Sequence, residues 1–207
     1  MCDASHQYVR AELVEARTFS YPGGVIYRLN RHPNMPAKCV YTVTAQLERD
    51  PSGEFRLEFA VASAAALVLP TAQKPGRADD LWQSTCFELF ARSKGSESYV
   101  ELNLSPSFQW AAYTFSGYRA GRRDLPTHDL EIWISPPDEW FFLSVEGLPD
   151  LGPEPMEIGL SAIIEEADGT KSYWALAHPP GDKPDFHDPA CFALELPVHH
   201  PPSSPRT

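Results

Sequence analysis

Residues 40–47 read VYTVTAQL, residues 50–53 read DPSG and residues 55–61 read FRLEFAV. The first and third stretches are rich in β-branched and aromatic residues, and the third alternates apolar and polar side chains with a period of two. That period places alternate side chains on opposite faces of a β-strand. The middle stretch has the Asp, Pro, Ser and Gly composition of a turn. Together the three stretches predict an antiparallel β-hairpin with one buried face.

The rest of the chain repeats this pattern of short strands separated by turns. Its 21 prolines indicate many turns, because helix interiors and central strands exclude proline. Away from the amino terminus, no window of about eleven residues carries an apolar stripe of helical period. We therefore predict an all-β fold, an antiparallel β-sandwich of the jelly-roll or immunoglobulin-like type with about ten strands. Further strands are expected at residues 66–69, 85–92, 99–104, 110–115, 130–134, 140–145, 157–164, 172–177 and 191–196.

The length of 207 residues fits one domain of this kind. We expect the sandwich to occupy residues 35–197. Residues 1–34 are expected to be an amino-terminal strand or arm packed on the sandwich, in which residues 8–17 form either one short helix or an edge strand. The tail, residues 198–207, is expected to be flexible, because its last nine residues (HHPPSSPRT) offer nothing to a core.

Composition excludes several classes of partner. The net charge of −11 opposes binding to a phosphate backbone, so we expect no nucleic acid. No apolar run reaches the length of a membrane span and no secretion-signal pattern opens the chain, so we expect no membrane and a cytoplasmic location. The four cysteines are scattered, which argues against a zinc site and, in the cytoplasm, predicts reduced thiols. The oligomeric state stays open.

The densest polar and aromatic segment runs from residue 79 to residue 119. If its strands pair, Trp82 and Glu88 on one strand lie beside Glu101 and Asn103 on the next. Such a surface suits a sugar, because aromatic rings stack on its CH faces while carboxylates and amides bond its hydroxyls. The alternative is that these residues are core and strand-end residues. The nearby arginines, which include Arg119, have two interpretations. Either they bind a phosphate or a carboxylate, or they belong to a solvated loop.

Two other interpretations of these residues stay open. Glu88 and Glu101 would serve as an acid and base if they form a glycosidase pair, in which case the protein is a glycan-acting hydrolase. Alternatively the domain has only a structural or protein-interaction role. The loop at residues 178–188 holds two histidines and three aspartates, but its prolines and its spacing favour a rigid structural loop over a metal site. No nucleophile elbow, phosphate loop or HExxH motif occurs in the sequence.

Three blocks of sequence carry a resemblance. LWQSTCFE over residues 81–88, YVELNLSPSFQWAAY over 99–113 and SYWALAHPPGDKPDFH over 172–187 are similar to segments of the DOMON-like proteins, bacterial relatives of the family 9 carbohydrate-binding modules. The resemblance covers roughly residues 35–197. It implies an antiparallel β-sandwich with a site for a sugar or another small ligand.

The resemblance also implies roles for particular residues. In carbohydrate-binding relatives two tryptophans clamp the sugar, helped by a glutamate six residues after the first tryptophan. Trp82 and Glu88 match that spacing, and Trp174 is placed to be the second tryptophan. Lys171 stands where these relatives have an asparagine.

We therefore predict a carbohydrate or sugar-derivative binding domain that is not catalytic. Its partner is expected to be a small-molecule or glycan ligand, and we expect neither a cofactor nor a metal. The expected site residues are Trp82, Glu88, Trp174, Glu101, Asn103 and Arg119.

Overall fold

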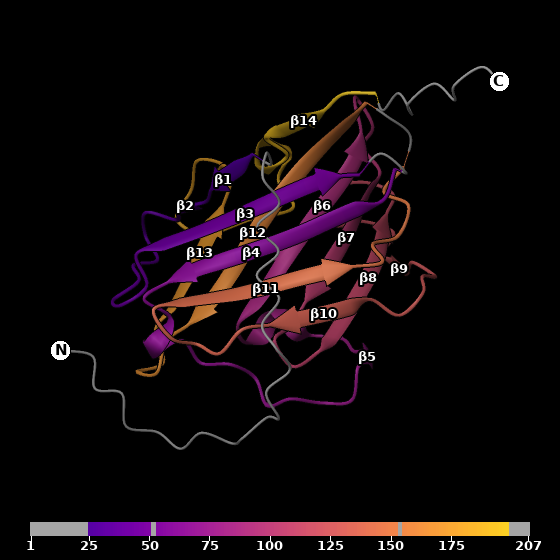
Figure 1. Cartoon of the computed structure of the whole chain (residues 1–207). Helices are drawn as coiled ribbons and strands as arrows, with labels where there is room; N and C mark the ends of the chain where they lie inside the picture. The colour runs from indigo at the N-terminus through magenta and orange to yellow at the C-terminus, as the bar shows by residue number, and fades with distance from the viewer. Residues whose placement is uncertain (1–24, 51–52, 153–154, 199–207) are drawn as a thin grey trace.

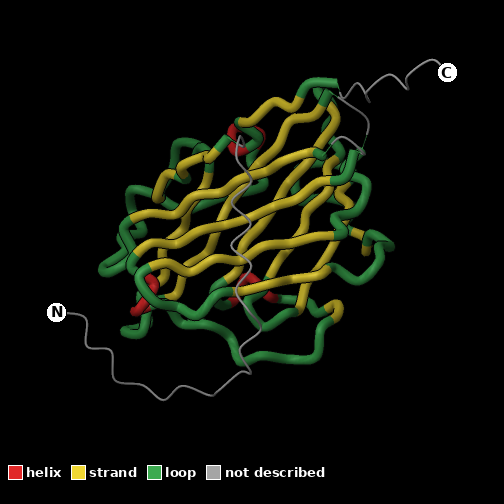
Figure 2. The backbone as a smooth tube through the Cα atoms, viewed as in Figure 1, coloured by secondary structure: helices red, strands yellow, loops and turns green. Residues whose placement is uncertain are grey.

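The computed structural model of the chain describes residues 25–50, 53–152 and 155–198. They form two stacked β-sheets, one of five strands and one of nine, with loops at the strand ends (Figures 1 and 2). The expected all-β sandwich is thereby confirmed, with more strands than anticipated because several are only two or three residues long. The segment expected as a helix or edge strand at residues 8–17, and the tail from residue 199, lie outside the described residues.

The five-stranded sheet lies in front in Figure 1 and is antiparallel throughout. The two strands of the expected hairpin pair with each other within it, as residues 42–49 and 55–62. In spatial order, its strands are β1 (Ile26–Arg28), β3 (Thr42–Arg49), β4 (Phe55–Ala62), β11 (Trp140–Glu146) and β10 (Glu131–Ile134).

The nine-stranded sheet lies behind it, and all its strand pairs are antiparallel except β5 with β8. Its path runs through β2 (Asn30–Arg31), β13 (Lys171–Ala175), β12 (Met156–Glu165), β6 (Cys86–Ser93), β7 (Tyr99–Leu104), β8 (Gln109–Phe115) and β5 (Gly76–Arg77). Beside this path β14 (Leu194–Leu196) pairs with β12, and β9 (Arg123–Asp124) pairs with β8. Since β1 and β2 belong to different sheets, residues 26–31 join the two layers.

The main core fills the space between the sheets. Phe87 of β6 stacks between two rings of the facing sheet, with ring centroids 5.0 Å from Phe59 and 6.1 Å from Phe141. All three side chains are fully buried. Alternate residues of each strand supply this layer, as the period of two requires.

A second apolar cluster covers the outer face of the nine-stranded sheet. It consists of Phe90, Tyr99, Ala111, Tyr113, Phe115, Ile163, Ala175, Phe186 and Phe192. Gly159 lets the covering segment approach the sheet, since a Cβ there would lie 3.1 Å from the carbonyl oxygen of Cys191. The sheet is therefore buried on both faces, and β6 reads as an almost continuous apolar run for that reason.

Helical structure in the described residues is limited to three 3₁₀ turns, and none of them has the length or apolar character to cross a bilayer. The turns are η1 (Ala64–Ala66), η2 (Leu81–Gln83) and η3 (Pro189–Cys191). The strand expected at residues 66–69 is wrong, because Ser63 turns the chain into η1 with a φ of 61°.

The expectation of reduced thiols holds for two of the described cysteines only. Cys86 and Cys191 are free and buried. Cys39 is disulfide-bonded, so the expectation of four free thiols is wrong.

Candidate functional site

Strand register gathers polar residues at one place on the outer face of the nine-stranded sheet. Glu88 of β6 lies directly opposite Asn103 of β7 and Ser161 of β12. Beyond them the same row continues to Ala111 on one side and Ala175 on the other. Because these flanking side chains are small, the surface sinks along this row, and the polar groups form its floor.

A cavity of about 730 Å³ lies over this floor. Side chains from strands β6, β7, β8, β12 and β13 line its base, and the loops after β8 and β13 contribute to its rim. A cavity of this size is in the range of small-molecule sites. Its lining residues are Met35, Asp80, Trp82, Glu88, Glu101, Asn103, Tyr113, Phe115, Arg119, Arg122, Ile163, Tyr173, Lys183, Pro184, Phe186 and His187.

Two carboxylates in the floor are held by neighbouring side chains. Ser161 Oγ donates to Glu88 Oε2 over 3.0 Å, and Asn103 Nδ2 donates to Glu101 Oε1 over 2.7 Å. Glu88 is only 4% exposed. Burial, reinforced by the charge of Glu101, raises the pKa of Glu88 to about 8. Burial likewise raises the pKa of Glu101, although the hydrogen bond from Asn103 opposes the shift.

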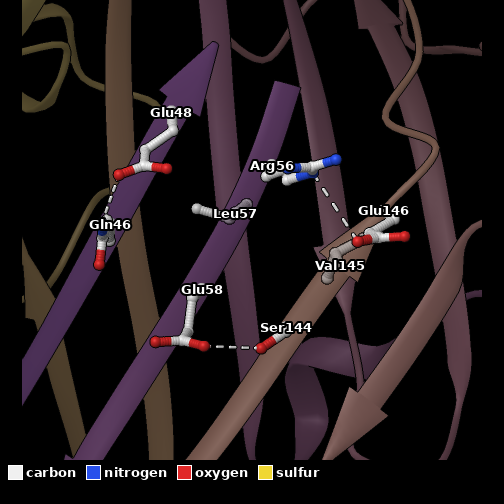
Figure 3. Close-up of a pocket in the computed structure, with 8 residues that line it drawn as sticks. All are labelled: Gln46, Glu48, Arg56, Leu57, Glu58, Ser144, Val145 and Glu146. Atoms are coloured by element: carbon white, nitrogen blue, oxygen red, sulfur yellow. Dashed lines mark hydrogen bonds and ion pairs between the residues drawn. The ribbon is translucent and has the colours of Figure 1, made fainter. Parts of the chain in front are cut away.

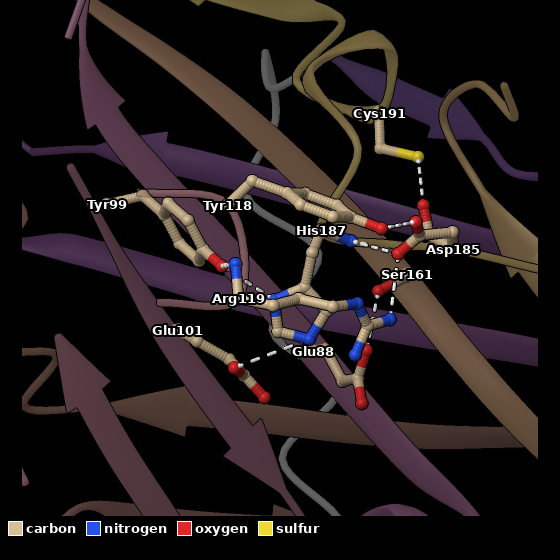
Figure 4. Close-up of polar contacts among 9 residues, drawn as sticks. All are labelled: Glu88, Tyr99, Glu101, Tyr118, Arg119, Ser161, Asp185, His187 and Cys191. Carbon is tan, nitrogen blue, oxygen red and sulfur yellow. Dashed lines mark hydrogen bonds and ion pairs between the residues drawn. The ribbon is translucent and has the colours of Figure 1, made fainter. Parts of the chain in front are cut away.

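A series of polar contacts runs from the rim to the floor (Figure 4). The backbone N–H of Arg119 donates to the Tyr99 hydroxyl over 3.1 Å, and that hydroxyl lies 2.8 Å from His187 Nδ1. Burial, with the charge of Arg119 adding to it, lowers the pKa of His187 to about 4, so the ring is neutral. The tautomer with its proton on Nε2 lets the Tyr99 hydroxyl donate to Nδ1. Nε2 lies 3.9 Å from Glu101 Oε2.

The Arg119 side chain is fixed at the rim. Its guanidinium donates to Asp185 Oδ1 over 2.7 Å, while the Tyr118 hydroxyl donates to Asp185 Oδ2 over 2.5 Å. Arg119 also has a backbone φ of 51°, and Asp80 on another side of the cavity has a φ of 59°. Such left-handed conformations cost energy for residues other than glycine and tend to gather at functional sites.

Trp82 lies on the 3₁₀ turn η2 that precedes β6. Its side chain lines the cavity and is 52% exposed, so an apolar ring face is available to a ligand. Lys171 Nζ donates to the backbone oxygen of Gln83 and lies 3.6 Å from Glu165 Oε2. Ser84 Oγ also donates to that carboxylate, over 3.1 Å. Lys171 therefore helps to hold the turn that presents Trp82.

The structure brings together five of the six residues expected from the sequence. Trp82, Glu88, Glu101, Asn103 and Arg119 all line the cavity. Trp174 does not. Its side chain is 4% exposed, belongs to the core between the sheets and donates to Ser172 Oγ over 2.9 Å.

The expected pairing of Trp82 with Trp174 across the site is therefore wrong. Alternation along β13 turns Trp174 inward and its neighbour Tyr173 outward into the cavity. Tyr173 takes the position in the wall that was expected of the second tryptophan.

Several cavity residues were not expected from the sequence. Tyr113 and Phe115 alternate with core residues along β8, so strand periodicity could have assigned them to this face. Phe186 and His187 come from the loop that was considered as a metal site. No group of three or more potential metal ligands occurs among the described residues. His187 instead contacts Tyr99 and Glu101.

No protein-family model matches the chain, and no curated protein matches its sequence. The fold does resemble solved structures. A candidate carbohydrate-binding protein from Bacteroides uniformis aligns with a TM-score of 0.58 and 16% identity over 82% of this chain and 84% of that one. A family 9 carbohydrate-binding module from Caldicellulosiruptor kristjanssonii, in complex with glucose, aligns with a TM-score of 0.50 and 9% identity over 87% and 88% of the two chains.

These similarities define the class of fold. The chain has the two-sheet β-sandwich of proteins described as carbohydrate-binding, as the resemblance in its sequence implied. Function depends on the side chains in the site rather than on the fold that carries them.

Proposed function

We propose that the protein binds a carbohydrate or sugar derivative, without transforming it, in the cavity on the outer face of the nine-stranded sheet. The observation that carries this proposal is the buried row of polar groups, with Glu88 and Asn103 at its centre, in the floor of a cavity of about 730 Å³. The β-sandwich neighbours, one of them in complex with glucose, support the same assignment.

The floor has the chemistry that sugar hydroxyls require. Each hydroxyl both donates and accepts hydrogen bonds, and the floor offers carboxylate oxygens at Glu101 together with the amide of Asn103. Glu88 adds a carboxyl that is protonated near neutral pH and can therefore donate as well as accept. Trp82 and Tyr173 supply aromatic rings for the CH faces of the sugar.

The two floor carboxyls are held by neighbouring side chains, Glu88 by the Ser161 hydroxyl and Glu101 by the Asn103 amide. Groups fixed in this way are suited to binding a ligand in one orientation. A glycosidase would instead use the two carboxyls as a protonated acid and an ionised base, and the release of sugar from a bound oligosaccharide tests that alternative.

The proposal is tested by isothermal titration calorimetry against a panel of mono- and oligosaccharides selected by thermal shift. A ligand of the native state must raise the melting temperature. Glu101→Gln is expected to weaken binding about tenfold, because a hydrogen bond to a charged acceptor is roughly twice as strong as a neutral one.

The matched control is Glu48→Gln. Glu48 accepts a hydrogen bond from the amide of Gln46 over 2.6 Å on the outer face of the other sheet. This variant is expected to bind as the wild type does. The proposal fails if no sugar raises the melting temperature, or if the two variants weaken binding equally. Release of reducing sugar from a bound oligosaccharide would favour the hydrolase instead.

A further inference from the structure

Two of the described cations in the cavity wall have no carboxylate within ion-pair distance. Arg119 is paired with Asp185, whereas Arg122 and Lys183 form no ion pair within the described part of the chain. Both side chains are exposed, and they come from loops far apart in the sequence. The chain carries a net charge of −11, so a group of cations at one cavity has the opposite sign to the protein as a whole.

Arg122 is positioned by an aromatic ring. Its guanidinium carbon lies 4.9 Å from the centroid of the Tyr113 ring, and the Tyr113 hydroxyl donates to Asp79. A guanidinium over a ring is attracted by the electrons of the ring face, and its N–H groups lie in its own plane. They remain available for the planar, two-pronged contact that guanidinium groups make with carboxylates and phosphates.

The floor and the rim of the cavity suit different parts of one ligand. The carboxylate of Glu101 in the floor would repel an anion, whereas Arg122 and Lys183 attract one. A ligand that places its hydroxyls on the floor and its negative group against Arg122 satisfies both.

We propose, resting on the proposed function, that the cavity selects acidic sugars and that Arg122, assisted by Lys183, binds their negatively charged group. Neutral sugars use the floor alone and bind more weakly. The negative group is a carboxylate or a phosphate, since both offer the oxygen pairs that a guanidinium binds.

The experiment uses the full chain and three hexoses of gluco, galacto and manno configuration. Each is titrated by calorimetry as the neutral sugar, as the uronate and as the 6-phosphate, at low salt and in 0.5 M sodium chloride. At least one acidic form is expected to bind about tenfold more tightly than its neutral parent at low salt, because charge-assisted hydrogen bonds are the stronger kind. Added salt is expected to remove most of this difference, since the rim is exposed and its charge is screened.

Arg122→Gln is the decisive variant, with Arg123→Gln as its control. Arg123 is the adjacent exposed arginine and does not line the cavity. Arg122→Gln is expected to abolish the preference, so that the neutral and acidic forms bind alike, and Arg123→Gln is expected to keep it. Melting temperatures of both variants separate a loss of binding from a loss of fold.

The outcomes distinguish this inference from the proposed function. If neutral sugars bind and their acidic forms bind no more tightly, or if Arg122→Gln keeps the preference, the acidic-sugar inference is wrong and the proposed function stands. If neither neutral nor acidic sugars bind, both fail. Preference for the uronate or for the phosphate identifies the group that the rim accepts.

Discussion

The outer faces of the two sheets carry the same set of polar residue types in the same register. In each, a glutamate lies directly opposite a serine on one neighbouring strand and a side-chain amide on the other. A second glutamate lies two residues from that amide on the same strand. The members are Ser144, Glu58, Gln46 and Glu48 on the five-stranded sheet, and Ser161, Glu88, Asn103 and Glu101 on the nine-stranded sheet.

The hydrogen bonds within the two sets are also alike. The serine hydroxyl donates to the central glutamate over 2.9 Å on the five-stranded sheet (Figure 3) and over 3.0 Å on the nine-stranded sheet (Figure 4). The amide donates to the second glutamate over 2.6 Å and 2.7 Å respectively. Each set even has an exposed tryptophan close by, Trp133 opposite Ser144 in the first case and Trp82 in the second.

The two sets differ in what surrounds them. Around Glu58 the surface forms a hollow of only about 30 Å³, whereas the cavity over Glu88 measures about 730 Å³. Glu58 is half-buried and Glu88 is fully buried. The aromatic cluster and the loops after β8 and β13 produce this difference. The same side chains form an ordinary sheet surface in one place and a candidate binding floor in the other.

The largest expected effect concerns the pH dependence of stability. The pKa of Glu88 is raised from 4.5 to about 8, so the folded state holds a proton that the unfolded state has released. Unfolding free energy is therefore lost as the pH rises from about 5 to about 8, by up to about 5 kcal/mol at about 1.4 kcal/mol per pKa unit. Glu88→Gln is expected to flatten this dependence when urea unfolding is followed at pH 5, 7 and 9.

Glu58→Gln is the matched control. Burial also raises the pKa of Glu58, but that carboxylate is partly open to water, so the variant is expected to change the slope much less. If unfolding free energy depends on pH with the same slope in both variants, the loops do not isolate Glu88 from water. The two outer faces would then not differ in the burial of their central glutamates.

A smaller effect is expected from the aromatic cover. Phe186 is 7% exposed and packs in the outer cluster of the nine-stranded sheet, whereas Trp140 on the five-stranded sheet is 41% exposed. Phe186→Ala is expected to lower the unfolding free energy by about 3–5 kcal/mol, as for other buried aromatics. Trp140→Ala is expected to cost less than about 1 kcal/mol. If denaturant unfolding gives similar losses of unfolding free energy for the two variants, the aromatic cluster does not act as a second core.

The strands could be predicted from the sequence more completely than the site could. Alternation assigned Glu101 and Asn103 to one face of β7 and Leu102 to the other, as the structure has it. The same alternation could not tell the Glu88 set from the Glu58 set, because both satisfy the same pattern. What separates them is the path of the loop at residues 176–193, which depends on contacts distant in sequence such as that between Tyr99 and His187.

Trp174 shows the same limit. This residue was selected by its similarity in position to a tryptophan of the relatives. Neighbouring residues of a strand point to opposite faces of the sheet, so an error of one position places the wrong side chain in the site. The structure puts Tyr173 on the cavity side and Trp174 in the core. The resemblance in sequence therefore identified the correct strand, but the wrong residue of that strand as the one that faces the cavity.

The smallest expected effect on stability accompanies a specific effect on binding, and it uses the two exposed tryptophans. Trp82 is 52% exposed and Trp133 is 44% exposed, so alanine at either position is expected to cost less than about 1 kcal/mol of unfolding free energy. Only Trp82 lines the large cavity. Because an aromatic ring stacked on a sugar contributes about 1–2 kcal/mol by analogy with aromatic pairs, Trp82→Ala is expected to weaken sugar binding about tenfold. Trp133→Ala should leave the affinity unchanged. Calorimetry measures the affinity of both variants, and melting temperatures measure their stability. If Trp133→Ala loses as much affinity as Trp82→Ala, the sugar binds on the five-stranded sheet instead.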